Sequence, residues 1–291
     1  MAFEAKFRKK NAKIAATSVK TYLANIRRLA RALGHDEVPV GGAWLGKAPA
    51  WLRKQKLNVR KILAAAAVKA AQVYGRKHEV LSKIMKKASE EYDAVRSKGK
   101  KTKREAALMP EGGWAAVAKA ATKMRGELPS SIDGMKAYML LQDAWLLSFY
   151  AKHTPRLIHS VQIGRGQNKI TKRGSAYTIR LEAHKTAKSA GPVSIKLHKS
   201  LWPITQRLIK SRPPDIRHHY LLSAPRGGKL SASQLSTRLR KITSKEIGRG
   251  FGAQILRVLR ATENSKEMEK VRQYLQEMGH GLKQEKKYVA K

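Results

Sequence analysis

The sequence predicts a mainly α protein with a small β-sheet (α+β), divided into a basic helical domain at residues 1–105 and a second domain at residues 106–291. Three observations support this fold class. Apolar residues recur at helical spacing over most of the chain, one stretch alternates apolar and polar residues as paired strands do, and a charged run separates two apolar regions. With 291 residues and 42% hydrophobic content, the chain can build two packed cores.

The first domain is expected to consist of amphipathic helices. Apolar side chains between Val19 and Leu33 share one helical face, and Gly34 is a suitable stop. Two further helices are expected at about 57–74 and 76–97, each with basic residues on the opposite face. The run Arg96–Arg104 has no apolar residue to bury, so it is expected to be a solvated linker that ends near Pro110.

The second domain is expected to be mostly helical around one hairpin. Helical patterns cover Trp114–Met124 and Met135–Tyr150. The segments Tyr177–Ala183 and Val193–Leu197 alternate like two strands, which a lysine-bearing loop, His184–Gly191, joins. Helical patterns then return at about 199–211, 231–246, 252–264 and 266–278.

The charge of the chain indicates a polyanionic partner. Lys and Arg number 62 against 20 Asp and Glu, a formal net charge of +42 that is spread over the whole length. Such a field is typical of proteins that follow a phosphate backbone, so double-stranded DNA is the expected partner. The basic residues expected to contact it are Lys20, Arg27, Arg28, Arg31, Arg60, Lys61, Lys100, Lys101, Lys103 and Arg104.

The sequence lacks the motifs of several kinds of enzyme and binding site. The absence of cysteine excludes disulfides, thiolate zinc sites and cysteine nucleophiles. Neither a phosphate-binding G-x-x-x-x-G-K-[ST] loop nor an H-E-x-x-H segment or carboxylate cluster occurs, so neither ATP nor a metal is expected as a cofactor. Because no apolar stretch of about 18 residues is present, the chain is expected to be soluble and intracellular, with no membrane partner.

Three segments in order carry candidate catalytic groups. Thr154–Val161 follows a hydrophobic helix and contains Arg156, and Gly252–Thr262 contains Arg257. Near the end of the chain, Met278-Gly-His280 precedes Tyr288, which stands three residues before the C-terminus. A phenol close to guanidinium and imidazole groups suits attack on a phosphodiester.

This order resembles the tyrosine recombinase (phage integrase) family, most closely the integrases of eukaryotic DNA viruses and mobile elements. In that family a first arginine follows a helix, a lysine sits in a β-hairpin, a His-x-x-Arg segment opens an Ala-Thr-containing helix, and Leu-Gly-His precedes a tyrosine nucleophile. The resemblance covers the second domain well and the first only in general character. It implies these catalytic residues: Arg156, Lys185, Gln254, Arg257, His280 and Tyr288.

The sequence departs from the family pattern at three points. Gln254 stands where the family has histidine; an amide can donate a hydrogen bond to phosphate but cannot exchange a proton near neutral pH. His159 replaces a glutamate shortly after the first arginine. Tyr288 follows His280 by eight residues where nine is usual.

The resemblance also implies roles. Arg156 and Arg257 would hold the non-bridging phosphate oxygens, Lys185 would protonate the leaving 5′ oxygen, and His280 would donate to the phosphate while Tyr288 attacks. The product would be a 3′-phosphotyrosyl bond and a free 5′ hydroxyl, a linkage that can be reversed without ATP or metal.

Family members close a helical domain and a catalytic domain around DNA as a clamp and work as tetramers on two sites. The same assembly is expected here, in the nucleus or nucleoid where DNA lies. Only Val289–Lys291 follow the candidate nucleophile, so contacts between protomers would use another surface.

Three other functions remain open on the sequence. A type IB topoisomerase shares the catalytic logic but relaxes supercoils as a monomer. An architectural DNA or RNA binder would account for the charge equally well, with Gln254 marking lost activity. A ribosomal-type protein is the third, and in the last two cases Tyr288 would be a terminal aromatic side chain packed on the core.

Overall fold

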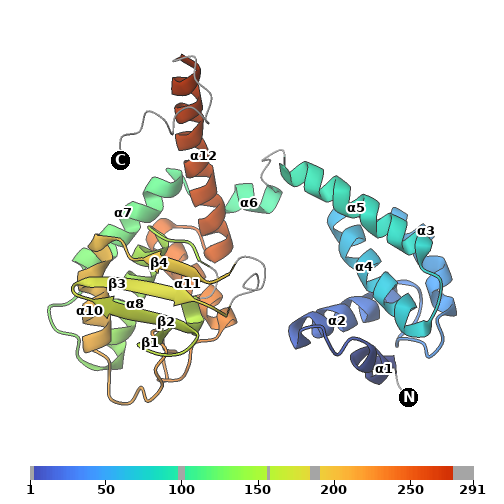
Figure 1. The fold of residues 1–291 in the computed structure, drawn as a ribbon, viewed down its shortest axis with the longest axis horizontal. Helices are drawn as coiled ribbons and strands as arrows, with labels where there is room; N and C mark the ends of the chain where they lie inside the picture. The colour runs from blue at the N-terminus through green and yellow to red at the C-terminus, as the bar shows by residue number, and fades with distance from the viewer. Residues whose placement is uncertain (1–2, 98–101, 156–157, 184–190, 278–291) are drawn as a thin grey trace. The chain divides into compact units, whose positions relative to one another are not determined.

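The computed structural model describes residues 3–97, 102–155, 158–183 and 191–277, and it divides into two compact units, Met1–Thr102 and Lys103–Lys291 (Figure 1). The first unit is helical and the second contains helices and one four-stranded sheet, which confirms the predicted α+β class. Within the described ranges, no helix is both long and apolar enough to cross a membrane.

The described part of the first unit contains the three predicted helices and three shorter helical elements that were not predicted, one of them a 3₁₀ helix. The helix expected at 76–97 begins later, at Glu79, because Gly75 ends the preceding helix in the left-handed conformation (φ 66°). The unpredicted helix α1 is short and carries only two large apolar side chains, Phe3 and Phe7, both buried. The elements are α1 (Phe3–Lys10), α2 (Ala16–Ala32), the 3₁₀ helix η1 (Ala43–Lys47), α3 (Ala48–Arg53), α4 (Leu57–Tyr74) and α5 (Glu79–Ser97).

Helix α4 is the centre of the first unit because its side chains are small. Its buried residues include Ala64, Ala66, Ala67, Ala70 and Ala71. Alanine favours the helix and lets neighbouring helices approach closely. As a result, α4 packs against α1, α2, α3 and α5, and the basic faces of these helices remain at the surface.

The run Arg96–Arg104 is not entirely a linker. Helix α5 continues to Ser97, and α6 (Lys103–Leu108) begins within the run. Leu108 packs against the core of the second unit, and Arg249 donates a hydrogen bond to the carbonyl of Ala107. The expectation of a fully solvated linker up to Pro110 was therefore wrong for α6, because the apolar residues that follow the basic run pack against this core.

The second unit is built around α8, whose aromatic side chains fill its core. Tyr138, Trp145, Phe149 and Tyr150 are fully buried, and Trp145 Nε1 donates to Thr205 Oγ1 of α10 at 2.8 Å. Helices α7 and α10 pack against α8, as α11 does. The helices of this unit are α6, α7 (Gly113–Gly126), α8 (Gly134–Tyr150), the 3₁₀ helices η2 (Ile158–Ser160) and η3 (Lys199–Leu201), α10 (Trp202–Lys210), α11 (Ala232–Ile247) and α12 (Ala253–Glu277).

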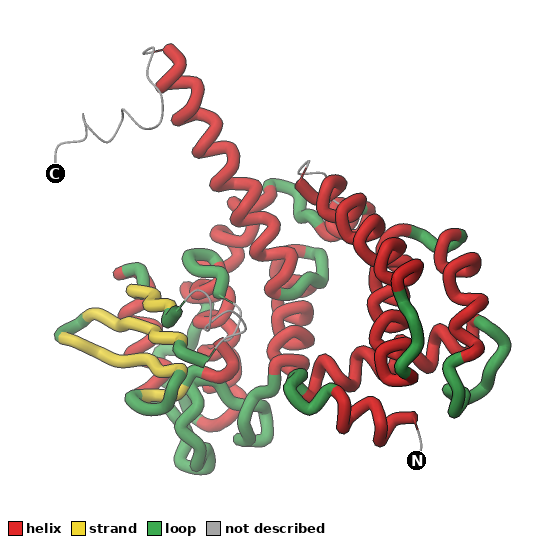
Figure 2. Tube along the Cα trace, turned by 45° about the vertical axis from the view of Figure 1, so that its right-hand side comes forward, coloured by secondary structure: helices red, strands yellow, loops and turns green. Residues whose placement is uncertain are grey.

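The sheet has the order β1-β2-β3-β4 and comprises β1 (Gln162–Ile163), β2 (Asn168–Arg173), β3 (Ala176–Leu181) and β4 (Val193–Lys196) (Figure 2). The predicted pairing of β3 with β4 is confirmed as antiparallel, with Ile179 opposite Ile195. Strand β2 pairs antiparallel with β3, and β1 runs parallel to β2. Neither β1 nor β2 was predicted, because β2 is largely polar and β1 is only two residues long.

Helix α12 corrects a second expectation. Two helices were expected at 252–264 and 266–278, but Ala253–Glu277 forms one continuous helix. Asn264 and Ser265, at the expected break, are exposed. Polar residues of this kind favour helix ends but are tolerated inside a helix when they face solvent.

The buried side chain of Asn168 joins the sheet to the turn that follows α8. Its Nδ2 donates to Ser160 Oγ at 2.7 Å and to the carbonyl of Ala183 at 3.1 Å. Its Oδ1 accepts from the backbone N–H groups of Glu182 and Ala183 at 3.0 and 2.9 Å. One amide therefore fixes both η2 and the end of β3.

Replacement of Asn168 with Ala should destabilise the protein by about 1–3 kcal/mol, because several polar groups lose a buried partner. Denaturant unfolding followed by circular dichroism measures this change. Asn264→Ala, at an exposed position on α12, is the matched control and should change stability by no more than about 0.5 kcal/mol. Equal stabilities of the two variants would contradict the role given to Asn168.

Candidate active site

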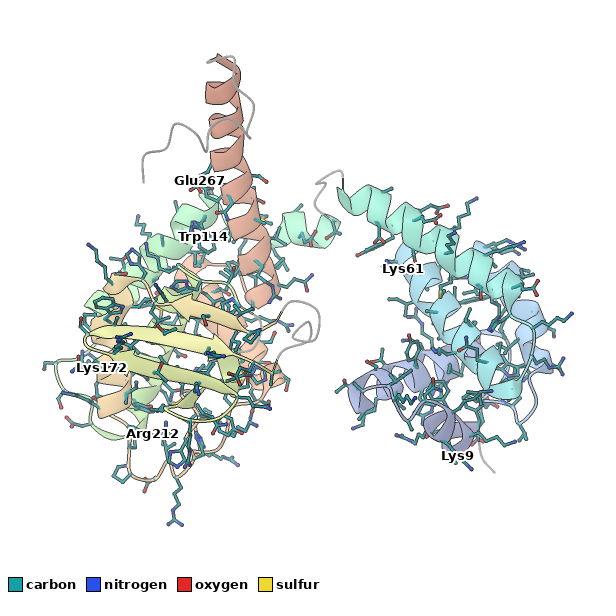
Figure 3. The ribbon with its side chains drawn as sticks, in the orientation of Figure 1. Lys9, Lys61, Trp114, Lys172, Arg212 and Glu267 are labelled. Atoms are coloured by element: carbon teal, nitrogen blue, oxygen red, sulfur yellow. The ribbon has the colours of Figure 1, made fainter. Side chains whose placement is uncertain are left out.

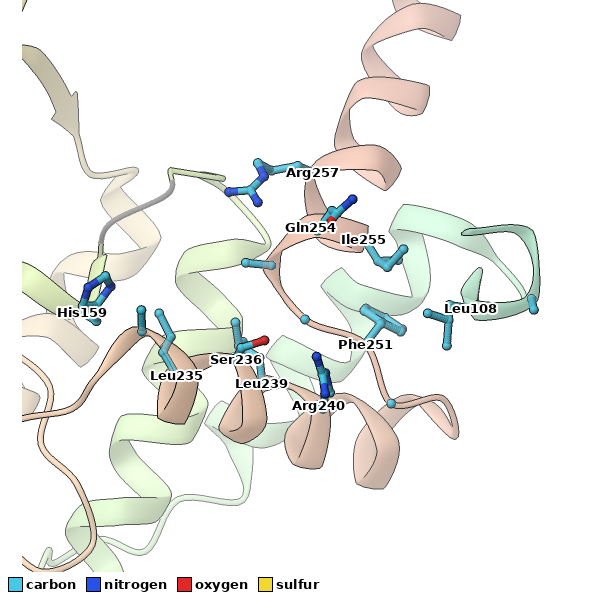
Figure 4. A pocket seen from close by; sticks show the side chains of 15 residues that line it. Leu108, His159, Leu235, Ser236, Leu239, Arg240, Phe251, Gln254, Ile255 and Arg257 are labelled. Carbon is cyan, nitrogen blue, oxygen red and sulfur yellow. The ribbon is translucent and has the colours of Figure 1, made fainter. Parts of the chain in front are cut away.

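A cavity of about 730 Å³ lies between α11 and the beginning of α12, and it contains two of the predicted catalytic residues, Gln254 and Arg257 (Figure 4). Its polar lining also includes His159, Ser236 and Arg240. The remaining lining residues are Ala107, Leu108, Ala232, Leu235, Leu239, Gly250, Phe251, Gly252, Ala253 and Ile255.

The connection between α11 and α12 sets the position of Gln254 and Arg257. The buried hydroxyl of Thr243 accepts from the Phe251 N–H at 2.8 Å and lies 2.9 Å from the Phe251 carbonyl oxygen, to which it can donate. Phe251 is itself buried in the core. At Gly252 a β-carbon would lie only 3.1 Å from Ser236 Oγ, so the absence of a side chain there lets the start of α12 approach α11 closely.

Helix α12 is held on its other side by α7. Arg260 lies over the ring of Trp114, which Figure 3 labels beside α12, with its guanidinium carbon 5.3 Å from the ring centroid. A cation over an indole face is attracted by the ring and also packs on it. This contact and the Thr243 hydrogen bonds together fix the first turns of α12.

His159 reaches the cavity from η2. The neighbouring Ile158 is fully buried, and Ser160 is bonded to Asn168, so the turn is anchored on both sides of the imidazole. Among the described residues, the buried Nδ1 atom of His159 has no hydrogen-bond partner. Burial lowers the pKa of His159, and the positive charge of Lys229 lowers it further.

Tyr150 connects the end of α8 to Arg257. Its fully buried hydroxyl lies 3.5 Å from the carbonyl oxygen of Pro155, the last described residue before Arg156. Burial raises the pKa of Tyr150 to about 12, and the positive charge of Arg257 opposes this rise. The Arg257 guanidinium is therefore close enough to Tyr150 to act on its ionisation.

The structure places two of the six predicted catalytic residues at one cavity. Gln254 and Arg257 line one cavity. Four other predicted residues, Arg156, Lys185, His280 and Tyr288, lie outside the described residues, and their roles remain predictions.

Sequence reasoning missed three side chains of the cavity. His159 was noted only as a departure from the family pattern, and Ser236 and Arg240 were not singled out. The last two lie on an amphipathic helix whose sequence resembles any basic surface helix, so no local signal distinguishes them. Within the described ranges, no group of three or more His, Cys, Asp or Glu side chains could hold a metal ion.

The predicted DNA-contacting residues of the first unit fall into two groups. Lys20, Arg28 and Arg31 are exposed on α2, and no ion pair joins them to a carboxylate within the described residues. Three others are paired: Arg27 with Glu4, Arg60 with Glu91 at 3.7 Å, and Lys61 with Asp93 at 3.1 Å.

Lys61, labelled in Figure 3, also lies over the ring of Tyr92, 4.4 Å from the ring centroid. Lys100 and Lys101 lie outside the described residues, as do the side chains of Lys103 and Arg104.

Comparison with known proteins gives little further information. No protein-family model matches the sequence, and no curated protein matches it. Among solved structures, this chain is similar to XerA recombinase, with 11% sequence identity and a TM-score of 0.35 over 88% of this chain and 80% of that one. A TM-score at this level does not establish a common fold.

The folded-state pKa of Tyr150, about 12, lies above the ordinary value of 10.0, so its contribution to stability is complete below pH 10 and is lost as the pH rises through 12. Tyr150→Phe removes the ionisable group. The wild type should therefore lose about 1.4 kcal/mol more stability than Tyr150→Phe between pH 9 and 11. Urea unfolding of both proteins at these two pH values measures the difference. Parallel losses in the two proteins would show that Tyr150 is not buried as described.

Proposed function

We propose that the protein is a site-specific DNA recombinase or integrase that cleaves and rejoins strands through a 3′-phosphotyrosyl intermediate, without metal or ATP. The observation that carries this proposal is the cavity in which Arg257, Gln254 and His159 meet. A guanidinium, an amide and an imidazole at one site are hydrogen-bond donors suited to the non-bridging oxygens of a phosphodiester. The order of catalytic segments in the sequence assigns the same cavity to strand cleavage.

In this mechanism Tyr288 attacks the phosphorus atom. Arg257 holds a non-bridging oxygen and, with Arg156, offsets the charge that builds in the transition state. Two residues close to Arg156 in the sequence lie near this site. The carbonyl oxygen of Pro155 lies beside the Tyr150 hydroxyl, and His159 lines the cavity. These positions support the proposal that Arg156 acts together with Arg257.

The other donors act on the leaving group and the phosphate. Lys185, which lies between β3 and β4 in the sequence, protonates the leaving 5′ oxygen, and His280 donates to the phosphate. A 5′ hydroxyl of another strand then attacks the phosphotyrosyl bond, which restores the phosphodiester and releases Tyr288. The energy of the original bond is conserved in the linkage, so the reaction needs no external energy source.

The first unit is proposed to bind the duplex through α2. Lys20, Arg28 and Arg31 lie on its exposed side and are not neutralised by carboxylates within the described residues. A helix with this character can lie in or across the major groove and contact phosphates. In the cell, the protein would act where DNA lies, in the nucleus or nucleoid, as a tetramer on two DNA sites.

One specific observation favours a second candidate function. Gln254 occupies a position at the cavity where an imidazole would exchange protons, so a catalytically inactive architectural DNA binder is the alternative. Covalent adduct formation separates the two functions, because only the recombinase forms an ester with DNA.

Incubation with a nicked suicide DNA substrate should give a denaturation-resistant protein–DNA adduct. Tyr288→Phe should abolish the adduct, because phenylalanine has no nucleophilic oxygen, and should leave salt-dependent DNA binding largely intact. Gel electrophoresis under denaturing conditions measures the adduct, and Tyr92→Phe, outside the proposed site, is the control that keeps it. An undiminished adduct in Tyr288→Phe would exclude this nucleophile.

DNA affinity should depend more on α2 than on α4. Arg28→Gln/Arg31→Gln and Arg60→Gln/Lys61→Gln each remove two positive charges, but in the second pair the carboxylates of Glu91 and Asp93 already offset the charges. If both α2 residues contact phosphate, the first double variant should reduce the slope of log K against log salt by about 1.8, since each phosphate contact contributes about 0.9. The second should reduce it by less. Fluorescence anisotropy over a salt series tests this order, and a larger effect of the α4 pair would refute it.

A further inference from the structure

Of the described side chains that line the cavity between α11 and α12, one can exchange a proton near neutral pH. Of the described residues that line it, the polar side chains are two guanidinium groups, an amide, a hydroxyl and the imidazole of His159. Guanidinium groups remain protonated in proteins, and amides and hydroxyls do not titrate in this range. Any proton exchange by these lining residues therefore falls to His159.

The described charged groups that line the cavity, and the one that acts on the pKa of His159, are all cationic. Arg257 comes from α12, Arg240 from α11 and Lys229 from the loop before α11, whereas α6 adds only apolar side chains. No carboxylate lines the cavity in the described part of the chain. Since burial and Lys229 lower the pKa of His159, the ring is neutral at neutral pH when the cavity holds no anion.

The buried Nδ1 atom of His159 bonds to no group in the described ranges, so this nitrogen has an unused hydrogen-bonding position. A buried polar atom without a hydrogen bond costs free energy, which falls when a ligand supplies the missing partner. In Figure 4 the Arg257 guanidinium extends from the first turn of α12 toward the side of the cavity on which His159 lies. An anion held by Arg257 would thus introduce negative charge near the imidazole.

We propose that His159 takes up one proton when a DNA phosphodiester enters this cavity, and that the resulting imidazolium donates a hydrogen bond to a non-bridging oxygen beside Arg257. The bound negative charge favours the protonated ring, and both ring nitrogens are then donors. His159 thereby supplies the imidazole that Gln254 does not. This inference rests on the proposed function, because it takes the cavity as the phosphate site of strand cleavage.

Nuclear magnetic resonance of histidine-labelled wild-type protein tests proton uptake directly. The ring signal of His159, assigned by its absence in His159→Gln, is followed against pH with and without a short DNA duplex. The titration midpoint of His159 should rise by about one pH unit or more in the presence of DNA. His219, which is exposed and does not line the cavity, is the internal control and should shift less.

The pH dependence of DNA affinity gives a second readout. Between pH 8 and 6, the wild type should gain more affinity than His159→Gln, up to about tenfold, because a pKa shift of one unit corresponds to at most a factor of ten. His219→Gln should behave as the wild type. The double variant His159→Gln/Gln254→His should recover the lost dependence, since it returns an imidazole to the cavity.

An unmoved His159 titration, or equal pH dependence in wild type and His159→Gln, overturns the proposal. The titration is measured in the wild type, so it decides the question even if a variant fails to fold. If the double variant shows the same weak pH dependence of DNA affinity as His159→Gln, the idea that His159 supplies the imidazole missing at position 254 is wrong. If the wild type forms no covalent adduct but the His159 signal shifts, the proposed strand cleavage is wrong and proton uptake is supported. If the adduct forms normally but the His159 titration does not move, strand cleavage is supported and proton uptake is wrong.

Discussion

The hydrogen bonds between the Thr243 hydroxyl and the backbone of Phe251 are the constraint on which the candidate site depends. They lie in a buried region, where a hydroxyl without partners would be costly, so the connection between α11 and α12 has one favoured conformation. Gly252 then permits close approach to Ser236. Because these contacts set where α12 begins, they also set where Gln254 and Arg257 stand relative to α11.

A second constraint places His159 opposite α12. Asn168 uses both ends of its amide to join η2 to the end of β3, and Ile158 anchors the same turn in the core. Both constraints are buried and neutral, although they position a cationic residue, Arg257, and a titratable one, His159. A rigid neutral framework of this kind can hold a guanidinium group and an imidazole at one cavity.

Asp and Glu side chains are few in this chain, and the basic residues with which they form ion pairs are less available to bind a polyanion. With 20 acidic residues against 62 basic ones, most cations cannot be paired. In the first unit, the ion pairs of Arg27, Arg60 and Lys61 join α1 to α2 and α4 to α5. Such surface pairs add little stability individually, but they lower the net charge of α4 while leaving Lys20, Arg28 and Arg31 on α2 exposed.

The sequence by itself determined the helices with strong apolar periodicity, the pairing of β3 with β4 and the α+β class, because these features follow from local patterns that repeat over many residues. It also indicated Gln254 and Arg257 through their order along the chain. Only the tertiary structure decided that β2 pairs with β3, that α12 is continuous, and that His159, Ser236 and Arg240 share a cavity with Arg257. These features depend on contacts between residues distant in sequence, and a polar strand or a basic helix face carries no local signal of the partner it will meet.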